Sequence, residues 1–269
     1  MGLSIAIKEM IYNKKMTAIM IICIIIVTML ITSVNILTSS YQDYIINLSR
    51  SRENWEANFS NVEFKNINYI ENDENIKEIS IVKDLGITEE NYSKDLTERM
   101  HIKAYDVNAL KNLEINLKEG KLPQNIDEII INEDMTFEIG DKIEATIGKD
   151  NYTFTIVGKI EKTDFDEFDY IHLVKTNGAI ILFDRENISE NEKVDVSILT
   201  NDISNIYVTT EKISQLINAD VTIKYNDELL SYACVAKEGS EFEKTLTIVK
   251  RNAYFYYNDS FSSSNIYNI

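Results

Sequence analysis

Residues 17–37 read TAIMIICIIIVTMLITSVNIL, and this segment determines how the rest of the chain is organised. It carries no charged side chain, and its polar residues are limited to Thr, Ser and one Asn. At about 1.5 Å per residue, a helix of this length spans about 30 Å, the thickness of the hydrocarbon core of a bilayer. A buried helix of a globular protein normally keeps a polar face, which this segment lacks. We therefore predict a transmembrane helix over residues 17–37.

A cleaved signal sequence is the alternative interpretation of such a segment. The apolar run is longer than the usual hydrophobic region of a signal peptide, and no small-residue cleavage site follows it. Cys23 follows two isoleucines in the middle of the run, which disfavours a lipid-modified cysteine. We expect the segment to remain as an anchor. A disulfide framework built from Cys23 and Cys234 is excluded, because Cys23 lies inside the membrane segment.

The charges that flank the helix predict its orientation. Basic residues outweigh acidic ones on its N-terminal side, with Lys14 and Lys15 closest to the membrane. Positive charges stay in the cytoplasm, so the N-terminus should be cytoplasmic and the bulk of the chain extracytoplasmic, in a single-pass cell-membrane protein. Arg50 and Arg52 argue weakly for the opposite orientation, but they lie further from the apolar run. Residues 1–16 are expected to form a cytoplasmic amphipathic segment.

The net charge excludes one class of partner. The chain has 27 Lys and Arg against 44 Asp and Glu, which gives a formal charge of −17. Such a surface repels phosphate backbones, so we expect no nucleic-acid partner. The hydrophobic fraction of 44% is sufficient for an ordinary globular core.

The residues after the anchor predict one mixed α+β extracytoplasmic domain over residues 38–245. No repeat or Pro/Gly-rich linker divides this region. A polar helix is expected from Ser39 to about Glu63, followed by a first strand over residues 62–70. Further strands are expected over residues 78–87, 100–107, 178–188 and 193–200, with a hairpin over 143–158, a short helix over 108–120 and a helix over 211–217.

No recognised catalytic pattern occurs in the sequence. It contains no G-x-S-x-G, H-E-x-x-H or glycine-rich phosphate loop, and His101 and His172 stand far apart. The acidic stretch TDFDEFDY at residues 163–170 lacks the glycine and the later glutamate of an EF-hand loop. We interpret it as a solvated loop with Phe165 and Phe168 beneath it. We therefore expect no enzyme, no catalytic residue, no cofactor and no metal site.

The only proline of the chain lies in EGKLPQNIDEIIIN, residues 119–132. Gly120 tolerates a positive φ angle and Pro123 fixes its own φ angle, so the segment predicts a turn. The β-branched residues Ile129 to Ile131 then predict a buried strand.

Several motifs, taken in order, resemble one family. IKEMIYNKKMTAIMIICIIIVTMLITSV resembles the first membrane helix of FtsX-like and MacB-like ABC transporter permeases, with its short surface helix and basic pair. LKEGKLPQNIDEIIIN and IGDKIEATIG…YTFTIVGKI resemble two segments of that family's extracytoplasmic domain, and VTIKYNDELLSYACVAKEGS is similar to the run before its second membrane helix. The matching positions in the first two segments are Glu119, Gly120, Pro123, Asn125, Glu128, Ile129, Asn132, Gly140, Asp141 and Gly158.

The resemblance implies a membrane subunit of an ABC transporter that pairs with a separate cytoplasmic ATPase. The extracytoplasmic domain would sense a substrate or transmit mechanical force, and Gly120 and Pro123 would shape a turn rather than bind ligands. Membrane lipid and another permease copy are the further partners that it implies.

The sequence departs from the family after residue 245. Such permeases carry three or more further membrane helices, whereas residues 246–269 contain no apolar run of bilayer length. The sequence therefore predicts a partial or truncated permease with an atypical C-terminal tail. The alternative is a single-pass membrane-anchored sensor or accessory binding protein.

Overall fold

The computed structural model describes residues 12–94, 97–217, 221–241 and 243–245. Most of the predicted amphipathic segment and the tail over residues 246–269 lie outside the described residues. The chain divides into two compact units, Met1–Leu48 and Ser49–Ile269, and each is considered separately. The domain boundaries expected at residues 38 and 245 remain predictions.

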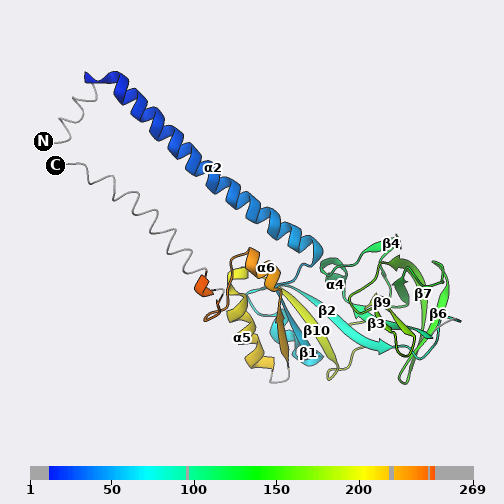
Figure 1. The fold of residues 1–269 in the computed structure, drawn as a ribbon. Helices are drawn as coiled ribbons and strands as arrows, with labels where there is room; N and C mark the ends of the chain where they lie inside the picture. Colours follow the sequence, from blue (N-terminus) through cyan, green and yellow to red (C-terminus); the bar gives the residue numbers. More distant parts are fainter. Residues whose placement is uncertain (1–11, 95–96, 218–220, 242, 246–269) are drawn as a thin grey trace. The chain divides into compact units, whose positions relative to one another are not determined.

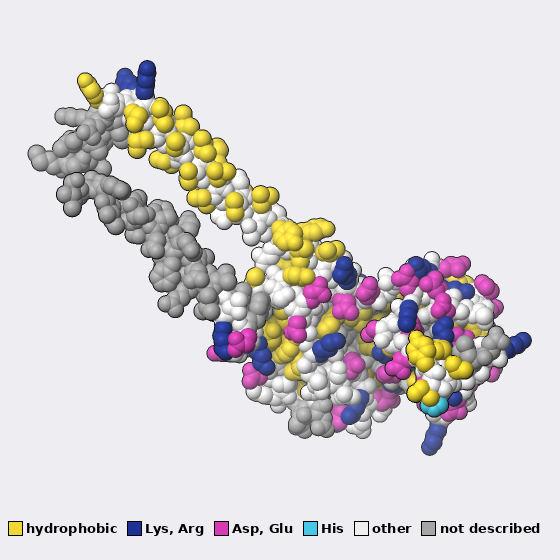
Figure 2. Space-filling view, viewed as in Figure 1, with side chains coloured by type: hydrophobic (Ala, Val, Ile, Leu, Met, Phe, Trp, Pro, Cys, Tyr) yellow, Lys and Arg dark blue, Asp and Glu magenta, His cyan; other side chains and the backbone are white. Residues whose placement is uncertain are grey.

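Helix α2, Lys14–Arg52, contains the predicted membrane segment. None of its residues is buried, and apolar side chains cover it along the predicted span (Figure 2). The hydroxyls of Ser33 and Thr38 donate to the carbonyl oxygens of Met29 and Val34, at 2.7 and 2.9 Å, so the polar side chains are satisfied within the helix. The helix is long and apolar enough to cross a membrane, with a mean hydropathy of 2.7 over its most apolar window.

The second unit is built on a mixed sheet with 11 strands in the described residues (Figure 1). The strand order is β11-β1-β10-β2-β3-β9-β5-β7-β4, while β6 pairs with β7 and β8 with β9. Among the described strands, the β3–β9 and β5–β7 pairs are parallel. The strands are β1 Ala57–Glu63, β2 Ile76–Ile87, β3 Thr97–Tyr105, β4 Leu117–Gly120, β5 Glu128–Asn132, β6 Lys142–Ile147, β7 Asp150–Ile160, β8 Glu167–Asp169, β9 Val174–Leu182, β10 Lys193–Thr200 and β11 Thr222–Tyr225. The predicted fold class, an apolar N-terminal helix followed by a mixed α+β domain, is confirmed.

Short helices cover part of this sheet. α3, Ile67–Glu71, contacts β2, and α5, Ile206–Ile217, contacts β1 and α3. The core between them contains the fully buried side chains of Phe59, Ile81 and Ile213. The remaining helices are α4 Val107–Asn112 and α6 Asp227–Tyr232, with 3-10 turns at Phe64–Asn66 and Ile203–Asn205.

Two expected elements after the anchor were wrong. Helix α2 ends at Arg52, and residues 57–63 form β1 instead of extending the helix to Glu63. Ala57 and Phe59 are both buried, because β1 lies between β10 and β11 and turns alternate side chains into the core. The strand expected over 62–70 is a 3-10 turn followed by α3, since Ile67 and Ile70, three positions apart, both enter the core.

The patterns later in the chain were more informative. The strand over Ile129 to Ile131 is confirmed as buried β5, and the hairpin over 143–158 is confirmed as β6 and β7. The helix expected over 108–120 ends at Asn112, and β4 occupies the end of that range. The helix expected over 211–217 starts earlier, at Ile206, so the β-branched run before it is helical.

Candidate binding cleft

The EGKLPQNIDEIIIN segment forms β4, a loop and β5, and it is held against β7. Gly120 pairs with Gly158 across β4 and β7, and the amide of Lys121 donates to the carbonyl oxygen of Val157 at 3.0 Å. Pro123 is buried, whereas Glu119 is exposed on the edge strand β4. The segment is therefore a turn that ends in a buried strand, as its sequence indicates.

Gly120 and Gly158 permit the close approach of these two backbones. Gly120 has a φ angle of +81°, and a Cβ atom on it would collide with the Val157 carbonyl oxygen. A Cβ atom on Gly158 would lie 2.7 Å from the Lys121 carbonyl oxygen and 2.9 Å from that of Glu119. Both positions require glycine for steric reasons.

Glu128, the first residue of β5, stabilises the loop that precedes it. Its carboxylate accepts hydrogen bonds from the Gln124 amide at 2.6 Å and the Asn125 amide at 3.1 Å, and it pairs with the Lys121 ammonium at 2.7 Å. The Lys121 hydrogen bond, followed by the one from the Gln124 amide, lowers the pKa of Glu128 to about 2. This carboxylate is committed to the turn and is not available to a ligand.

The other motif residues also occupy turns. Gly140 has a φ angle of +99°, and its amide donates to Ile156 at 2.8 Å. The Asp141 carboxylate accepts from the Glu138 amide at 2.9 Å, which closes the turn before β6. Lys14 and Lys15 lie exposed in the first turn of α2, far along the chain from these turns.

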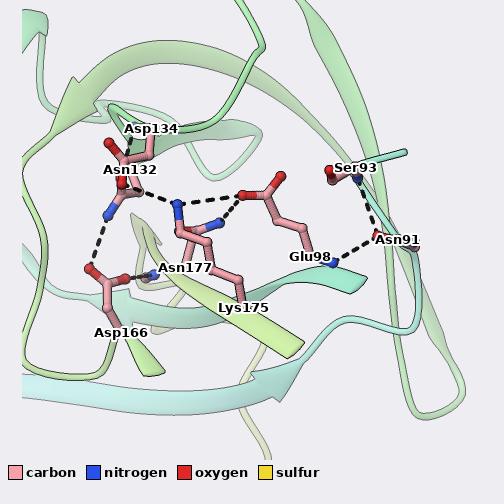
Figure 3. Close-up of polar contacts among 9 residues, drawn as sticks. Asn91, Ser93, Glu98, Asn132, Asp134, Asp166, Lys175 and Asn177 are labelled. Atoms are coloured by element: carbon pink, nitrogen blue, oxygen red, sulfur yellow. Dashed lines mark hydrogen bonds and ion pairs between the residues drawn. The ribbon is translucent and has the colours of Figure 1, made fainter. Parts of the chain in front are cut away.

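The acidic stretch at residues 163–170 is tied to the sheet through Asp166. Its carboxylate accepts from the Asn132 side-chain amide at 2.9 Å (Figure 3). It also accepts from the Thr163 amide at 2.7 Å and from the Gly178 amide. Phe165 is buried as expected, while Phe168 is more than a third exposed. In the described residues, no group of three or more His, Cys, Asp and Glu side chains has metal-binding geometry.

A buried polar network adjoins Asp166. The fully buried Asn177 donates to Glu98 at 2.7 Å, and Lys175 lies 3.7 Å from Glu98 and 3.1 Å from Asp134 (Figure 3). These residues connect β3, β9 and the turn after β5. We interpret the network as structural, because each of its charges has an opposite charge beside it.

The two histidines lie in different surroundings. The Nε2 atom of His101 is 2.8 Å from a carboxylate oxygen of Asp84, and the Nδ1 atom of His172 is 2.7 Å from one of Asp169. The histidines do not meet, and neither borders a nucleophile in the contacts that the structure describes.

A cleft of about 450 Å³ lies on the sheet face that carries β1, β10, β2 and β3. Strand register sets its floor, since Asp195, Val82 and Tyr105 are neighbours across β10, β2 and β3. Trp55 forms part of the wall at one side, and Phe165 forms part of it at another. We call this hollow, lined by residues of β1, β3 and β10 and by the loops at 113–116 and 161–165, the sheet cleft.

The sheet cleft combines aromatic rings with lysines. The Lys103 ammonium lies 4.1 Å from the centre of the Phe165 ring, and the Lys224 ammonium lies 5.8 Å from the centre of the Trp55 ring. Burial, with smaller contributions from Asp164 and Glu53, raises the pKa of Tyr105. The Tyr105 phenol is therefore neutral in this cleft.

None of the motif residues singled out from the sequence lines the sheet cleft. The cleft residues were missed because they come from strands far apart in the chain. The signal available in the sequence was the alternation of side chains between the two faces of a strand. Residues two positions apart share a face, and such pairs are Lys103 and Tyr105 in β3, Asn58 and Ser60 in β1, and Asp195 and Ser197 in β10.

Part of the chain is similar to a transport permease. No family model matches the chain. It is 29% identical over 101 residues to HrtB from two strains of Staphylococcus epidermidis, named as a hemin transport system permease; the match covers 36% of this chain and 25% of the relative. The chain thus matches about a quarter of the length of these relatives. Over that stretch, the match confirms the resemblance to a transport permease.

Two solved structures are similar in fold at low scores. The extracellular domain of the ABC-type transporter YknZ from Gram-positive bacteria has a TM-score of 0.43 at 14% identity, covering 59% of this chain and 83% of that one. The periplasmic region of MacB from Actinobacillus actinomycetemcomitans has a TM-score of 0.45 at 11% identity, covering 70% and 96%. At these scores the likeness supports no inference about function.

Proposed function

We propose that this chain acts as a membrane subunit of an ABC transporter of the FtsX-like permease type. The observation that carries the proposal is the 29% identity over 101 residues with a transport permease. The apolar helix α2, followed by a mixed α+β domain, supports it because the arrangement suits a subunit with one part in the membrane and another in water.

The proposed topology places the N-terminus in the cytoplasm and the sheet domain outside. Lys14 and Lys15 at the start of α2 support this orientation, because cytoplasmic flanks are enriched in Lys and Arg. Lys149, in the exposed turn between β6 and β7, would then lie on the extracytoplasmic side.

In the proposed function, a separate cytoplasmic ATPase hydrolyses ATP. The sequence has no glycine-rich phosphate loop of its own. The sheet domain would sense a substrate or transmit force to the membrane. Membrane lipid and a second permease copy would be further partners. The sheet cleft favours a second candidate function, a membrane-anchored binding protein that needs no ATPase.

Cysteine labelling tests the topology in intact cells. In a background with Cys23→Ser and Cys234→Ser, a single Lys149→Cys should react with a membrane-impermeant maleimide. A single Lys14→Cys should react only after the cells are permeabilised. The reverse pattern would contradict the proposed orientation.

Crosslinking distinguishes the permease from the anchored binding protein. A photoreactive amino acid at Lys15 should crosslink to an ABC ATPase, identified by mass spectrometry of the native membrane. The same amino acid at Lys149 is the matched control and should not capture that ATPase. If Lys15 captures none while the chain is correctly inserted, the second candidate function is favoured.

A further inference from the structure

We propose that the sheet cleft binds an amphipathic anion: a molecule with an apolar body and a carboxylate, sulfonate or phosphate head group. The proposal concerns the cleft alone and holds whether or not the chain works with an ATPase. Size, unpaired cations and hydrogen-bond donors carry it.

The size and lining of the sheet cleft suit an apolar body. Its volume of about 450 Å³ lies within the range of small-molecule sites. Val82, Leu113 and Ile115 are half-buried and provide apolar surface, and Trp55 and Phe165, both largely buried, provide rings at its walls. An apolar group placed there would lose contact with water against a preformed surface.

The lysines of the cleft set the preferred charge. Lys103 and Lys224 form no ion pair with any residue that the structure describes, and each is held over an aromatic ring instead. Lysines of the domain that do have carboxylate partners include Lys65, Lys83, Lys118, Lys121, Lys175 and Lys212. Lys162, which also lines the cleft, forms no ion pair with a described residue either. Three cations without acidic partners therefore line the same hollow.

Most of the acidic side chains that line the cleft already have hydrogen-bond or ion-pair partners within the protein. Glu53 accepts from the Trp55 indole at 3.0 Å, Asp195 accepts from the Asn61 amide at 3.0 Å, and Glu161 pairs with Lys118. The remaining acids, Glu114 and Asp164, are exposed and solvated. Lysines without an acidic partner therefore outnumber these remaining carboxylates in the cleft, with Lys103, Lys162 and Lys224 against Glu114 and Asp164.

Hydrogen-bonding side chains beside Lys224 also favour an anion. Lys224, Asn58 and Ser197 are neighbours across β11, β1 and β10. Ser60 donates to Asn58 at 2.9 Å, and Asn58 donates to the Ser197 hydroxyl at 2.9 Å. The Ser197 hydroxyl is left with its hydrogen to donate, and none of the described residues accepts it. An anionic head group beside Lys224 would satisfy this donor.

The single tryptophan of the chain, Trp55, is a built-in reporter for the test. The full-length protein in dodecyl maltoside micelles is titrated with the fluorescent anion anilinonaphthalene sulfonate, and energy transfer from Trp55 to the dye is recorded. The neutral dye phenylnaphthylamine has the same apolar body without the sulfonate and is the matched ligand control. We expect saturable transfer to the anion and about tenfold weaker binding of the neutral dye.

Variants assign the binding to the cleft. Lys103→Met and Lys224→Met keep the aliphatic stem and remove the charge, and each should weaken binding of the anion about three- to tenfold with no change for the neutral dye. Lys224→Arg should retain binding, and Lys149→Met, in the β6–β7 turn, is the control. Circular dichroism verifies that each variant is folded.

Three outcomes would overturn the proposal. Equal binding of the two dyes would show that the cleft does not select charge. Unchanged anion binding in folded Lys103→Met and Lys224→Met would place the dye elsewhere. Stronger binding of dodecyltrimethylammonium, tested by its competition with the dye, would assign the cleft to cations.

Discussion

The turn at residues 119–132 and the sheet cleft lie in the same domain, yet they use polar side chains in opposite ways. In the turn, the Glu128 carboxylate is satisfied by two backbone amides and Lys121. In the sheet cleft, Lys103 and Lys224 have rings beside them and no acidic partner among the described residues. Polar groups that are satisfied internally stabilise a fold, whereas uncommitted ones are available to a ligand. Substitutions in the turn should therefore cost stability, and those in the cleft should cost binding.

The largest expected effect is that of Gly120→Ala. The new Cβ atom would meet the Val157 carbonyl oxygen at a φ angle of +81°, so we expect the free energy of unfolding to fall by roughly 3 kcal/mol or more. Urea unfolding of the full chain in micelles, followed by Trp55 emission, measures it. Gly140→Ala is the matched control: its φ angle is +99°, but no atom lies within 4 Å of the new Cβ, so only about 1 kcal/mol should be lost. Equal losses would show that collision is not the cause.

Glu128→Gln should have the next largest effect and should depend on pH. The pKa of Glu128 is lowered from 4.5 to about 2 in the folded protein, so its stabilising contribution is complete above pH 4.5 and is lost as the pH falls towards 2. We expect the variant to be about 1–2 kcal/mol less stable near neutral pH. The difference should shrink at about pH 3, in unfolding curves recorded at both pH values. A difference that is constant with pH would contradict the assignment.

Asn58→Ala should have a smaller effect on stability. It removes the donor to Ser197 and the acceptor for Ser60, at a cost of about 1 kcal/mol. In a double-mutant cycle, Asn58→Ala combined with Ser197→Ala should cost less than the sum of the single variants, because both remove one shared hydrogen bond. Additive losses would mean that the two side chains act independently.

Lys224→Met should leave stability within about 0.5 kcal/mol of the parent protein, because Lys224 is exposed and its nearest aromatic ring is 5.8 Å away. The same variant is expected to weaken anion binding. A large loss of stability would show that Lys224 has a structural role like that of Glu128. The turn and the sheet cleft would then not differ in how they use charged side chains.

The sequence predicted what local patterns determine. The apolar run in α2, the Ile triplet of β5 and the β6–β7 hairpin each carry their signal within a few residues. The helix expected through residues 53–63 was wrong because Trp55 and Phe59 are four positions apart, which suits a helix face. Pairing of β1 with β10 and β11 overrides that local pattern.

The sheet cleft could not be predicted in this way. Asn58 and Ser197 meet across 139 positions of sequence, and neither belongs to a recognisable motif. The motif glycines, in contrast, stand out because backbone geometry restricts them to one residue type. Motifs therefore revealed where the chain turns, and only the tertiary structure revealed where a ligand could lie.

The position of β1 in the sheet also constrains how the chain is made. β1 follows α2 directly and is among the first parts of the domain to leave the ribosome, but its partners β10 and β11 are among the last. Until they arrive, both edges of β1 present unpaired backbone groups, which invite pairing with other chains. Closing so long a loop also makes assembly of the sheet slow. The emerging β1 is thus open to incorrect pairing over an interval set by the rate of translation.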